Sequence, residues 1–257
     1  MTERYLEGRH AIVTGGGAGI GLAIAHALAE RGASLTLLGR RMDRLAAAAA
    51  ALAPVPVLAT ECDVADERSV AAAFALSRRQ FPAPYILVNN AGQAEVAPFA
   101  ELPRESWDRM LAVNLTGTWL CSREVYPAMA AAGTGRIVNI ASVAGVRGFA
   151  GGAGYAASKH GIVGLTRSLA MEAARLGVTV NAVCPGYADT GMGAGAAENV
   201  ARQRGIALEE AERVIARTLP LGRLIRPDEV AATVAWLCSE GASAVSGQAI
   251  VIAGGDA

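Results

Sequence analysis

The chain has 257 residues, and its 23 basic and 23 acidic side chains cancel to a net charge of zero. A balanced charge creates no field that attracts nucleic acid or an anionic membrane surface, so we expect a small-molecule partner. Hydrophobic residues make up 53% of the chain but aromatic residues only 5%, which is typical of small-residue helices packed on an aliphatic sheet. At this length a single domain is the expected organisation.

Neither a membrane span nor a secretion signal is predicted. The most apolar uncharged stretch, residues 45–60, is interrupted by Pro54 and Pro56, and the N-terminal residues lack an apolar signal core. We therefore expect a cytoplasmic protein. The four cysteines, at positions 62, 121, 184 and 238, have no paired Cys or Cys/His spacing, so we predict buried thiols and no metal site.

Short aliphatic runs alternate with longer amphipathic or Ala-rich segments along the chain. Seven runs are predicted to be strands: 11–14, 34–38, 55–61, 85–89, 136–140, 178–183 and 249–252. Six segments are predicted to be helices: 20–31, 41–53, 66–81, 103–132, 155–176 and 227–237. Buried strands joined by helical crossovers form a parallel sheet. We predict an α/β fold, a single-domain Rossmann architecture whose doubly wound, parallel, seven-stranded sheet carries helices on both faces.

Two segments depart from this alternation. Residues 142–154 contain five glycines, and residues 185–219 form a long insertion. Each follows the C-terminal end of a predicted strand, where open α/β sheets bind ligands. We expect one domain over residues 1–257, with a mobile substrate lid at about 187–219.

A glycine-rich turn follows the first predicted strand. Glycines let the backbone turn tightly and approach a pyrophosphate, and the N-terminus of the following helix attracts negative charge. A plain tight turn gives a similar pattern, but the position in the first strand–helix turn favours a dinucleotide site. The candidate cofactor residues here are Gly15, Gly17, Gly19, Ile20 and Gly21.

Polar residues also follow the third and fourth predicted strands. Asp63, before Val64, either accepts a hydrogen bond from an adenine amino group or caps the helix that begins near residue 66. The segment of Asn90, Ala91 and Gly92 either lines the cofactor pocket or forms a polar turn. We expect both segments at the cofactor site.

Four separated residues form a candidate catalytic set. Ser142 follows the fifth predicted strand, and Lys159 lies one helical turn after Tyr155, so the two share a helix face. A free tyrosine has a pKa of about 10, and an acid/base that works near neutral pH needs that pKa lowered by neighbouring cations. Ser142 can hold the substrate oxygen. Asn114, within a predicted helix, is expected to link towards Lys159 and complete a proton path.

With these motifs the chain resembles the short-chain dehydrogenase/reductase family, in its compact branch. The resemblance extends over nearly the whole chain through Thr14 to Gly21, Asp63, Asn89 to Gly92, Asn114, Ser142, Tyr155 to Lys159, Asn181, Pro185 with Gly186, Thr190, and the end from Gly247 and Gln248 to Gly254 and Gly255. It implies Tyr155 as acid/base, Ser142 as substrate clamp, Lys159 as ribose ligand and pKa depressor, and Asn114 as relay anchor. It also implies that Ile20, Asp63, Val64, Asn90, Pro185, Gly186 and Thr190 contact the cofactor.

The residues after the second predicted strand bear on the choice of cofactor. Where NAD-specific relatives carry an acid for the ribose hydroxyls, this chain has Gly39, followed by Arg40 and Arg41. A guanidinium can bind the 2′-phosphate of NADP bidentately, so NADP(H) is favoured. Ala18 stands where many NADP-specific relatives have a second basic residue. The alternative is that both arginines are solvated residues at a helix start, in which case NAD(H) is used.

The substrate is the least determined feature. Candidate pocket residues are Ser142, Val143, Val146, Tyr155, Tyr187 and Met192. Segments 158–161 and 181–186 are similar to 3-oxoacyl and polyketide reductases, so a 3-oxoacyl/3-hydroxyacyl substrate is expected, with a simple secondary alcohol or a steroid as alternatives. Other classes are a redox-silent nucleotide sensor or scaffold, and a lyase or epimerase. The Ala-rich helices around Asn114 and Lys159 predict a homotetramer or dimer.

Overall fold

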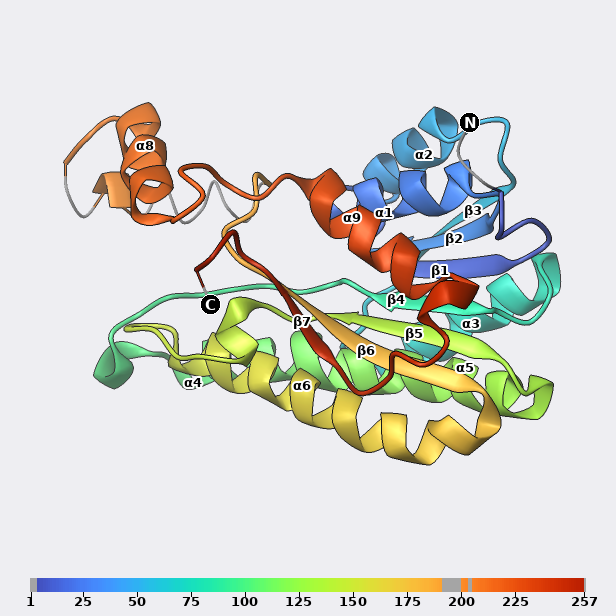
Figure 1. Ribbon diagram of the computed structural model, residues 1–257. Coiled ribbons are helices and arrows are strands. Elements are labelled where there is room, and N and C mark those ends of the chain that lie inside the picture. The colour runs from blue at the N-terminus through green and yellow to red at the C-terminus, as the bar shows by residue number, and fades with distance from the viewer. Residues whose placement is uncertain (1–3, 191–199, 203–204, 257) are drawn as a thin grey trace.

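The computed structural model describes residues 4–190, 200–202 and 205–256. Over these residues the chain forms one sheet of seven parallel strands in the order β3-β2-β1-β4-β5-β6-β7 (Figure 1). The strands are β1 (His10–Thr14), β2 (Ser34–Gly39), β3 (Val57–Glu61), β4 (Ile86–Asn89), β5 (Gly135–Ile140), β6 (Val178–Pro185) and β7 (Ala249–Ile252). The predicted doubly wound parallel sheet is confirmed. The strand order reverses between β1 and β4, and ligands bind at such switch points.

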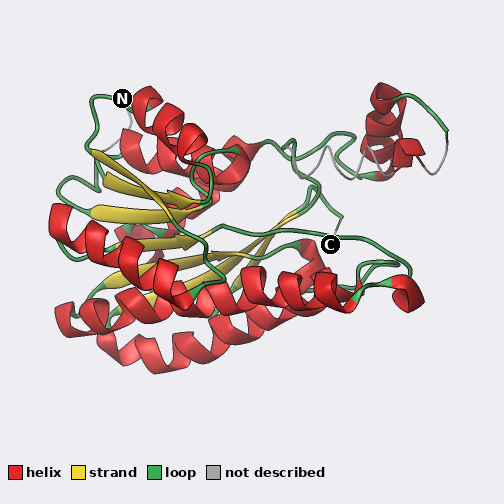
Figure 2. Ribbon diagram, turned by 180° about the vertical axis from the view of Figure 1, so that it is seen from behind, coloured by secondary structure: helices red, strands yellow, loops and turns green. Residues whose placement is uncertain are grey.

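Helices cover both faces of the sheet (Figure 2). One face carries α1 (Gly19–Glu30), α2 (Met42–Ala51) and α9 (Pro227–Leu237), and the other carries α3 (Glu67–Gln80), α4 (Arg104–Met110), α5 (Gly117–Ala132) and α6 (Ala153–Ala173). In β1, Ala11 and Val13 belong to the first core and Ile12 to the second. This alternation explains why the strands are continuous apolar runs: both faces are buried.

The predicted helix 103–132 has a different internal geometry. It is α4, then a π-helical turn over Leu111–Thr116, then α5. A π-turn widens the helix locally and is frequent at functional sites. It contains Asn114, whose carbonyl accepts a hydrogen bond of 2.7 Å from the Thr118 hydroxyl. The predicted strand 55–61 begins at Val57 instead, since Pro56 has no N–H to donate to a ladder.

The long insertion after β6 contains α8 (Leu208–Thr218), which stands apart from the helices that cover the sheet (Figure 1). Its buried residues Ala211 and Ile215 pack in a small core of their own with Val200, Ala201 and Ile206 of the insertion and with Leu224 just after it. The predicted lid at 187–219 includes residues 191–199 and 203–204, outside the described part, so lid motion stays a prediction. No helix in the described part is long and apolar enough to cross a membrane.

Candidate functional site

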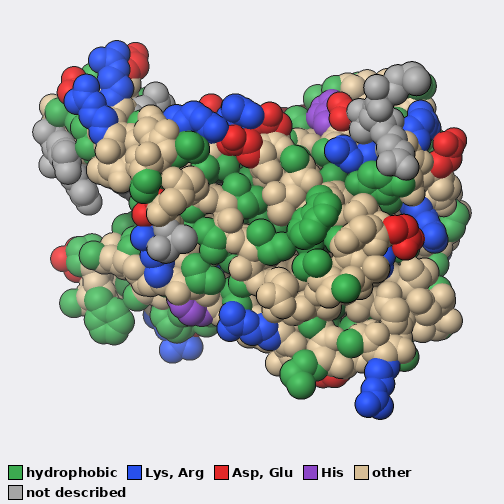
Figure 3. All heavy atoms as spheres, viewed as in Figure 1, with side chains coloured by type: hydrophobic (Ala, Val, Ile, Leu, Met, Phe, Trp, Pro, Cys, Tyr) green, Lys and Arg blue, Asp and Glu red, His purple; other side chains and the backbone are tan. Residues whose placement is uncertain are grey.

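A cavity of about 520 Å³ lies at the C-terminal ends of the central strands. Figure 3 shows the surface hollowed beneath the α8 segment. A second cavity of about 280 Å³ shares Gly15, Ala18, Arg44, Ala91 and Gly92 with the first and continues towards the end of β2. Together they form a groove along the edge of the sheet where the strands end. This groove extends from the glycine-rich turn to Tyr155.

The glycine-rich turn is joined to the end of β4 by hydrogen bonds. The Thr14 hydroxyl accepts the N–H groups of Asn90 and Ala91, both at 2.9 Å, and Asn90 Nδ2 donates to the Thr14 carbonyl at 2.9 Å. Gly15 and Gly19 have positive φ of 66° and 54°. The Ala18 N-cap of α1 provides no side-chain hydrogen bond, so backbone N–H groups at this helix end can bind an anion.

Gly21, predicted as a cofactor residue, lines neither of the two cavities, and its role at the cofactor stays a prediction. A Cβ on Gly21 would lie 2.3 Å from the Gly15 carbonyl oxygen. Gly21 therefore lets α1 begin close against the turn. We expect its contribution to a bound phosphate to be through backbone shape.

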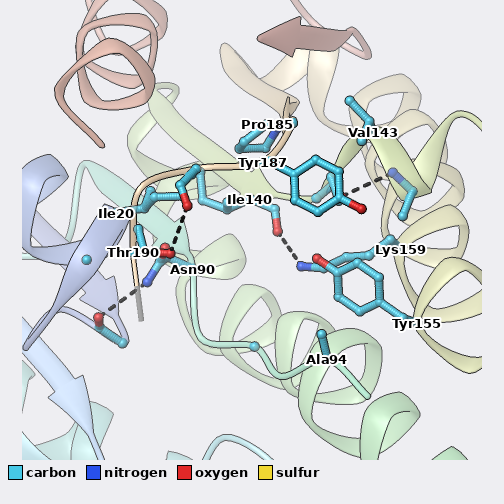
Figure 4. Close-up of a pocket in the computed structure, with 18 of the residues that line it drawn as sticks. Ile20, Asn90, Ala94, Ile140, Val143, Tyr155, Lys159, Pro185, Tyr187 and Thr190 are labelled. Carbon is cyan, nitrogen blue, oxygen red and sulfur yellow. Dashed lines mark hydrogen bonds between the residues drawn. The ribbon is translucent and has the colours of Figure 1, made fainter. Parts of the chain in front are cut away.

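Three of the four side chains predicted for catalysis lie together in the larger cavity. Ser142, Tyr155 and Lys159 all line the larger cavity. The Lys159 ammonium donates to the Ile140 carbonyl at 2.8 Å and lies 5.7 Å from the centroid of the Tyr155 ring. Figure 4 shows the Tyr187 ring just above the side chains of Tyr155 and Lys159 in this view, and all three line the larger cavity.

Burial determines the ionisation of the pair. It raises the pKa of Tyr155, and a hydrogen bond with Ser142 opposes that shift. Burial also lowers the pKa of Lys159 to about 8. In the protein alone the Lys159 ammonium is bonded to the Ile140 carbonyl and desolvation of the phenolate dominates. Tyr155 is therefore a neutral phenol at pH 7, the form that donates a proton. The lowered Tyr155 pKa, expected from Lys159 together with the positive ring of an oxidised nicotinamide, stays a prediction for the complex.

Asn114 is fully buried behind the cavity and does not line it. Its Oδ1 accepts the Gln93 N–H and its Nδ2 donates to the Gln93 carbonyl and to Ser158 Oγ, each at 2.9 Å. A Cβ on Gly92 would lie 3.3 Å from Asn114 Oδ1 and 3.6 Å from Lys159 Nζ. Asn114 and Lys159 thus flank the same glycine without a direct hydrogen bond.

Other predicted site residues fall at several places. Ile20, Asn90, Val143, Pro185, Gly186, Tyr187 and Thr190 line the larger cavity, and Gly17, Arg40, Asp63 and Val64 line the smaller one. Val146 is exposed and lines neither, contrary to the prediction. Its N–H donates to the Val143 carbonyl at 3.0 Å, which turns the chain outwards. Met192 lies outside the described residues.

The sequence left open whether Asp63 caps a helix or lies at the cofactor site, and the structure gives the capping role to Asp66 instead. Asp66 is the N-cap of α3 and accepts the Arg68 N–H at 2.9 Å. Asp63 accepts the Ala65 N–H at 3.0 Å and lines the smaller cavity. The capping alternative therefore applies to Asp66, and Asp63 is left at the groove.

Two arginines at the groove escaped the sequence reasoning. Arg44, on α2, lines both cavities, and Arg147, beyond Ser142, lines the larger one. Arg40 lies in the turn after β2 and Arg44 in the first turn of α2, so no helical spacing joins them, and the position of Arg44 just after the second strand was the available signal. Arg41, between them, is exposed and pairs with Asp43 at 2.7 Å. All four cysteines are buried thiols, as predicted.

The family described as enoyl-(acyl carrier protein) reductase matches residues 15–256. The crystal structure of a variant of actinorhodin polyketide ketoreductase with NADPH superposes with a TM-score of 0.94, at 39% identity, covering 99% of this chain and 98% of that one. This chain belongs to the short-chain dehydrogenase/reductase family. The resemblance expected from the motifs is confirmed.

Curated members of the short-chain dehydrogenase/reductase family are similar over almost their full length. One, from Streptomyces violaceoruber, is named as a ketoacyl reductase of the granaticin polyketide synthase, and is 43% identical over 95% of this chain and 92% of its own. Cis-4-hydroxycyclohexanecarboxylate dehydrogenase of Sinomonas cyclohexanicum is 42% identical over 99% and 98%. The protein is an NAD(P)-dependent short-chain dehydrogenase/reductase that acts on CH–OH and C=O groups.

Proposed function

We propose that this enzyme interconverts 3-oxoacyl and 3-hydroxyacyl compounds with NADP(H), using Tyr155 as the acid/base. The observation that carries the proposal is the placement of the Tyr155 phenol beside Ser142 and Lys159 in one cavity that continues to the glycine-rich turn. The groove fits a dinucleotide: the α1 N-terminus has no side-chain cap and the cradle is built of glycines. The bound cofactor supplies or accepts the hydride.

The residues of this chain handle the oxygen and its proton. Ser142 hydrogen-bonds the substrate oxygen and fixes the carbonyl carbon for attack. Tyr155, a neutral phenol through burial, donates its proton to the oxygen as negative charge develops there, and takes it back in the oxidation direction. Lys159 holds a positive charge beside the phenolate that forms. Asn114 fixes the start of α6 through Ser158 Oγ, which donates to the Tyr155 carbonyl at 2.7 Å.

NADP(H) is supported by charge at the adenosine end of the groove. Arg40 and Arg44 both line the smaller cavity beside Gly39, which offers no carboxylate to repel a 2′-phosphate. Arg44 provides the second cation that Ala18 does not. The similar ketoreductase structure contains NADPH.

The cofactor preference is tested by kcat/KM for NADPH and NADH in the wild-type enzyme, Arg40→Asp and Arg44→Gln. We expect a preference for NADPH that each variant lowers at least tenfold, because a bidentate guanidinium–phosphate contact is lost. A tenfold preference for NADH in the wild-type enzyme would refute the assignment and favour the alternative of solvated arginines.

The substrate class is tested by nicotinamide absorbance with 3-oxo esters, simple ketones and steroid ketones. Highest kcat/KM on 3-oxo compounds supports the proposal, whereas a preference for simple or steroid ketones supports those alternatives. Absence of turnover on every carbonyl supports a redox-silent nucleotide-binding protein. A lyase or epimerase would convert its substrate without releasing the cofactor in its other oxidation state.

We also propose a homotetramer, or failing that a dimer, in which α5 and α6 pack against other copies. Met171 on α6 is 84% exposed and Trp119 on α5 is also exposed in the single chain, and burial of such side chains favours association. Light scattering at micromolar concentration tests this, and a monomer refutes it. A cytoplasmic location stays a prediction.

A further inference from the structure

Arg147 lies at the substrate end of the larger cavity. It follows Ser142 by five residues, just after the single 3-10 turn η3 (Val143–Gly145). Its backbone N–H donates to the Val143 carbonyl at 2.9 Å, which holds the residue against the turn that Ser142 caps. The position of its backbone is thus tied to the residue that we assign to the substrate oxygen.

The charged side chains among the described lining residues are all cationic: Arg44, Arg147 and Lys159. Arg44 also lines the smaller cavity, where we place the adenosine phosphate. Lys159 is 4% exposed and donates to the Ile140 carbonyl. The Arg147 side chain is 43% exposed. Arg147 is therefore the cation that an incoming substrate meets.

Asp256 orients this guanidinium. Its Oδ2 lies 2.7 Å from Arg147 Nη2, and its side chain is only 19% exposed. The residue belongs to the C-terminal tail after β7, which packs on Pro220 and Leu221 through Gly255 and Gly254, and Figure 1 shows this end of the chain beneath α8. A guanidinium has five N–H donors, and this pair uses one of them. The remaining donors can bind a second carboxylate in the bidentate manner that arginine favours.

The cavity around Arg147 is otherwise apolar on its substrate side. Val96, Phe149 and Tyr187 line it there, and the Ala97 N–H bonds to the Gly151 carbonyl at 3.0 Å, which joins the two loops that carry Val96 and Phe149. A ligand here would have one end at Ser142 and Tyr155 and the other end at the Arg147 cation, with an apolar body in between. These features fit an oxo or hydroxy acid.

We propose that Arg147 binds a free carboxylate of the substrate, so that the enzyme prefers 3-oxo and 3-hydroxy acids over their neutral esters. The inference rests on the proposed function and names its substrate class. Asp256 is a positioning residue: it holds the guanidinium at the rim, and its charge also opposes the incoming carboxylate. A phosphate of a coenzyme A thioester is the other anion that an arginine could bind, and the experiment separates the two.

The test compares kcat/KM for acetoacetate and methyl acetoacetate with NADPH in the wild-type enzyme and in Arg147→Gln. We expect the acid to be preferred in the wild type, and the acid-to-ester ratio to fall at least tenfold in the variant, mostly through KM for the acid. Arg175→Gln, which removes an exposed arginine of the turn that follows α6, is the matched control and leaves the ratio unchanged.

Asp256→Asn provides an independent measurement should Arg147→Gln fail to fold. The asparagine oxygen still accepts a hydrogen bond from the guanidinium and so keeps it in place, while the negative charge that opposes the carboxylate is removed. The acid-to-ester ratio therefore rises at least threefold, and an unchanged or lower ratio overturns the inference. A smaller than tenfold fall in folded Arg147→Gln also overturns it.

Three further outcomes are decisive. If Arg147→Gln instead impairs acetoacetyl-coenzyme A but not its neutral N-acetylcysteamine analogue or the acid, the bound anion is a phosphate and the inference fails. Turnover of esters alone in the wild-type enzyme overturns the inference and leaves the proposed function standing. Turnover of no acid, ester or thioester of this class overturns both.

Discussion

At the scale of single residues, Tyr155 has the role that is simplest to test. In the proposed function its phenol supplies the proton, and the pyrophosphate binds at the other end of the groove. We expect Tyr155→Phe to lower turnover by at least about 100-fold with the cofactor dissociation constant nearly unchanged. Turnover is measured by nicotinamide absorbance and binding by fluorescence titration. Retention of more than a tenth of wild-type turnover would contradict the assignment.

The Lys159 ammonium makes the reaction depend on pH. Its pKa is lowered to about 8 by burial, whereas burial raises the pKa of the Tyr155 phenol. The charged lysine is therefore present below pH 8 and is lost above it, while the phenol keeps its proton. We expect kcat/KM for ketone reduction to be level below pH 8 and to fall by about tenfold per pH unit well above it. A level profile up to pH 9.5 would be inconsistent with a catalytic ammonium.

At the scale of elements, the first strand–turn–helix unit depends on how closely α1 approaches the turn. In Gly21→Ala the new methyl group would meet the Gly15 carbonyl oxygen at 2.3 Å, so the helix start must shift and the phosphate-binding N–H groups move with it. We expect the dissociation constant for NADPH to rise at least tenfold, as measured by fluorescence titration.

Gly241→Ala is the matched control for this change. A Cβ at Gly241 meets nothing closer than Ser239 Oγ at 3.6 Å, so cofactor affinity is expected to stay at the wild-type value. Equal affinities for the two variants would show that the start of α1 has no effect on the cofactor.

The π-helical turn between α4 and α5 is an element that the hydrophobic pattern did not predict. The spacing of apolar residues over 103–132 predicts one continuous helix, and α4, the π-helical turn and α5 do follow one another without a break. The widened turn places Asn114 against Gln93 and Ser158, which lie in a loop and in another helix. The spacing of apolar residues within one segment carries no information about partners so distant in sequence, so it could not predict the π-helical turn.

At the scale of the whole molecule, His10 couples stability to pH. The buried imidazole of β1 bonds to the Pro82 carbonyl at 3.1 Å and to the Thr36 hydroxyl at 2.9 Å. Burial lowers its pKa from 6.5 to about 4. The unfolded chain therefore binds a proton between pH 6.5 and pH 4 that the folded chain excludes, and the free energy of unfolding falls over this range as pH falls, by up to about 3 kcal/mol.

The contribution of His10 is isolated with His10→Gln, which removes the titrating group and keeps a hydrogen-bonding side chain. Denaturant unfolding of both proteins at pH 7 and pH 4.5 gives two differences in free energy. We expect the variant to lose less stability than the wild type on acidification. Equal losses in the two proteins would mean that His10 does not contribute to acid sensitivity.

Local features of the sequence determined the fold and much of the site. The alternation of aliphatic runs and helices predicts the parallel sheet because each strand face must be buried. The glycine-rich turn and the i, i+4 spacing of Tyr155 and Lys159 depend on backbone geometry over a few residues, so the sequence shows them directly. Ser142 was predicted for the same reason, since it directly follows a strand.

Only the tertiary structure decided what these residues face. The Lys159 ammonium bonds to the Ile140 carbonyl, and Arg147 pairs with Asp256 near the C-terminus. Such pairs exist because the crossovers bring the C-terminal ends of several strands to one edge of the sheet, and topology rather than local spacing selects which loops meet there. Desolvation at that edge then sets the protonation states, because it depends on all the atoms that surround a group rather than on its sequence neighbours.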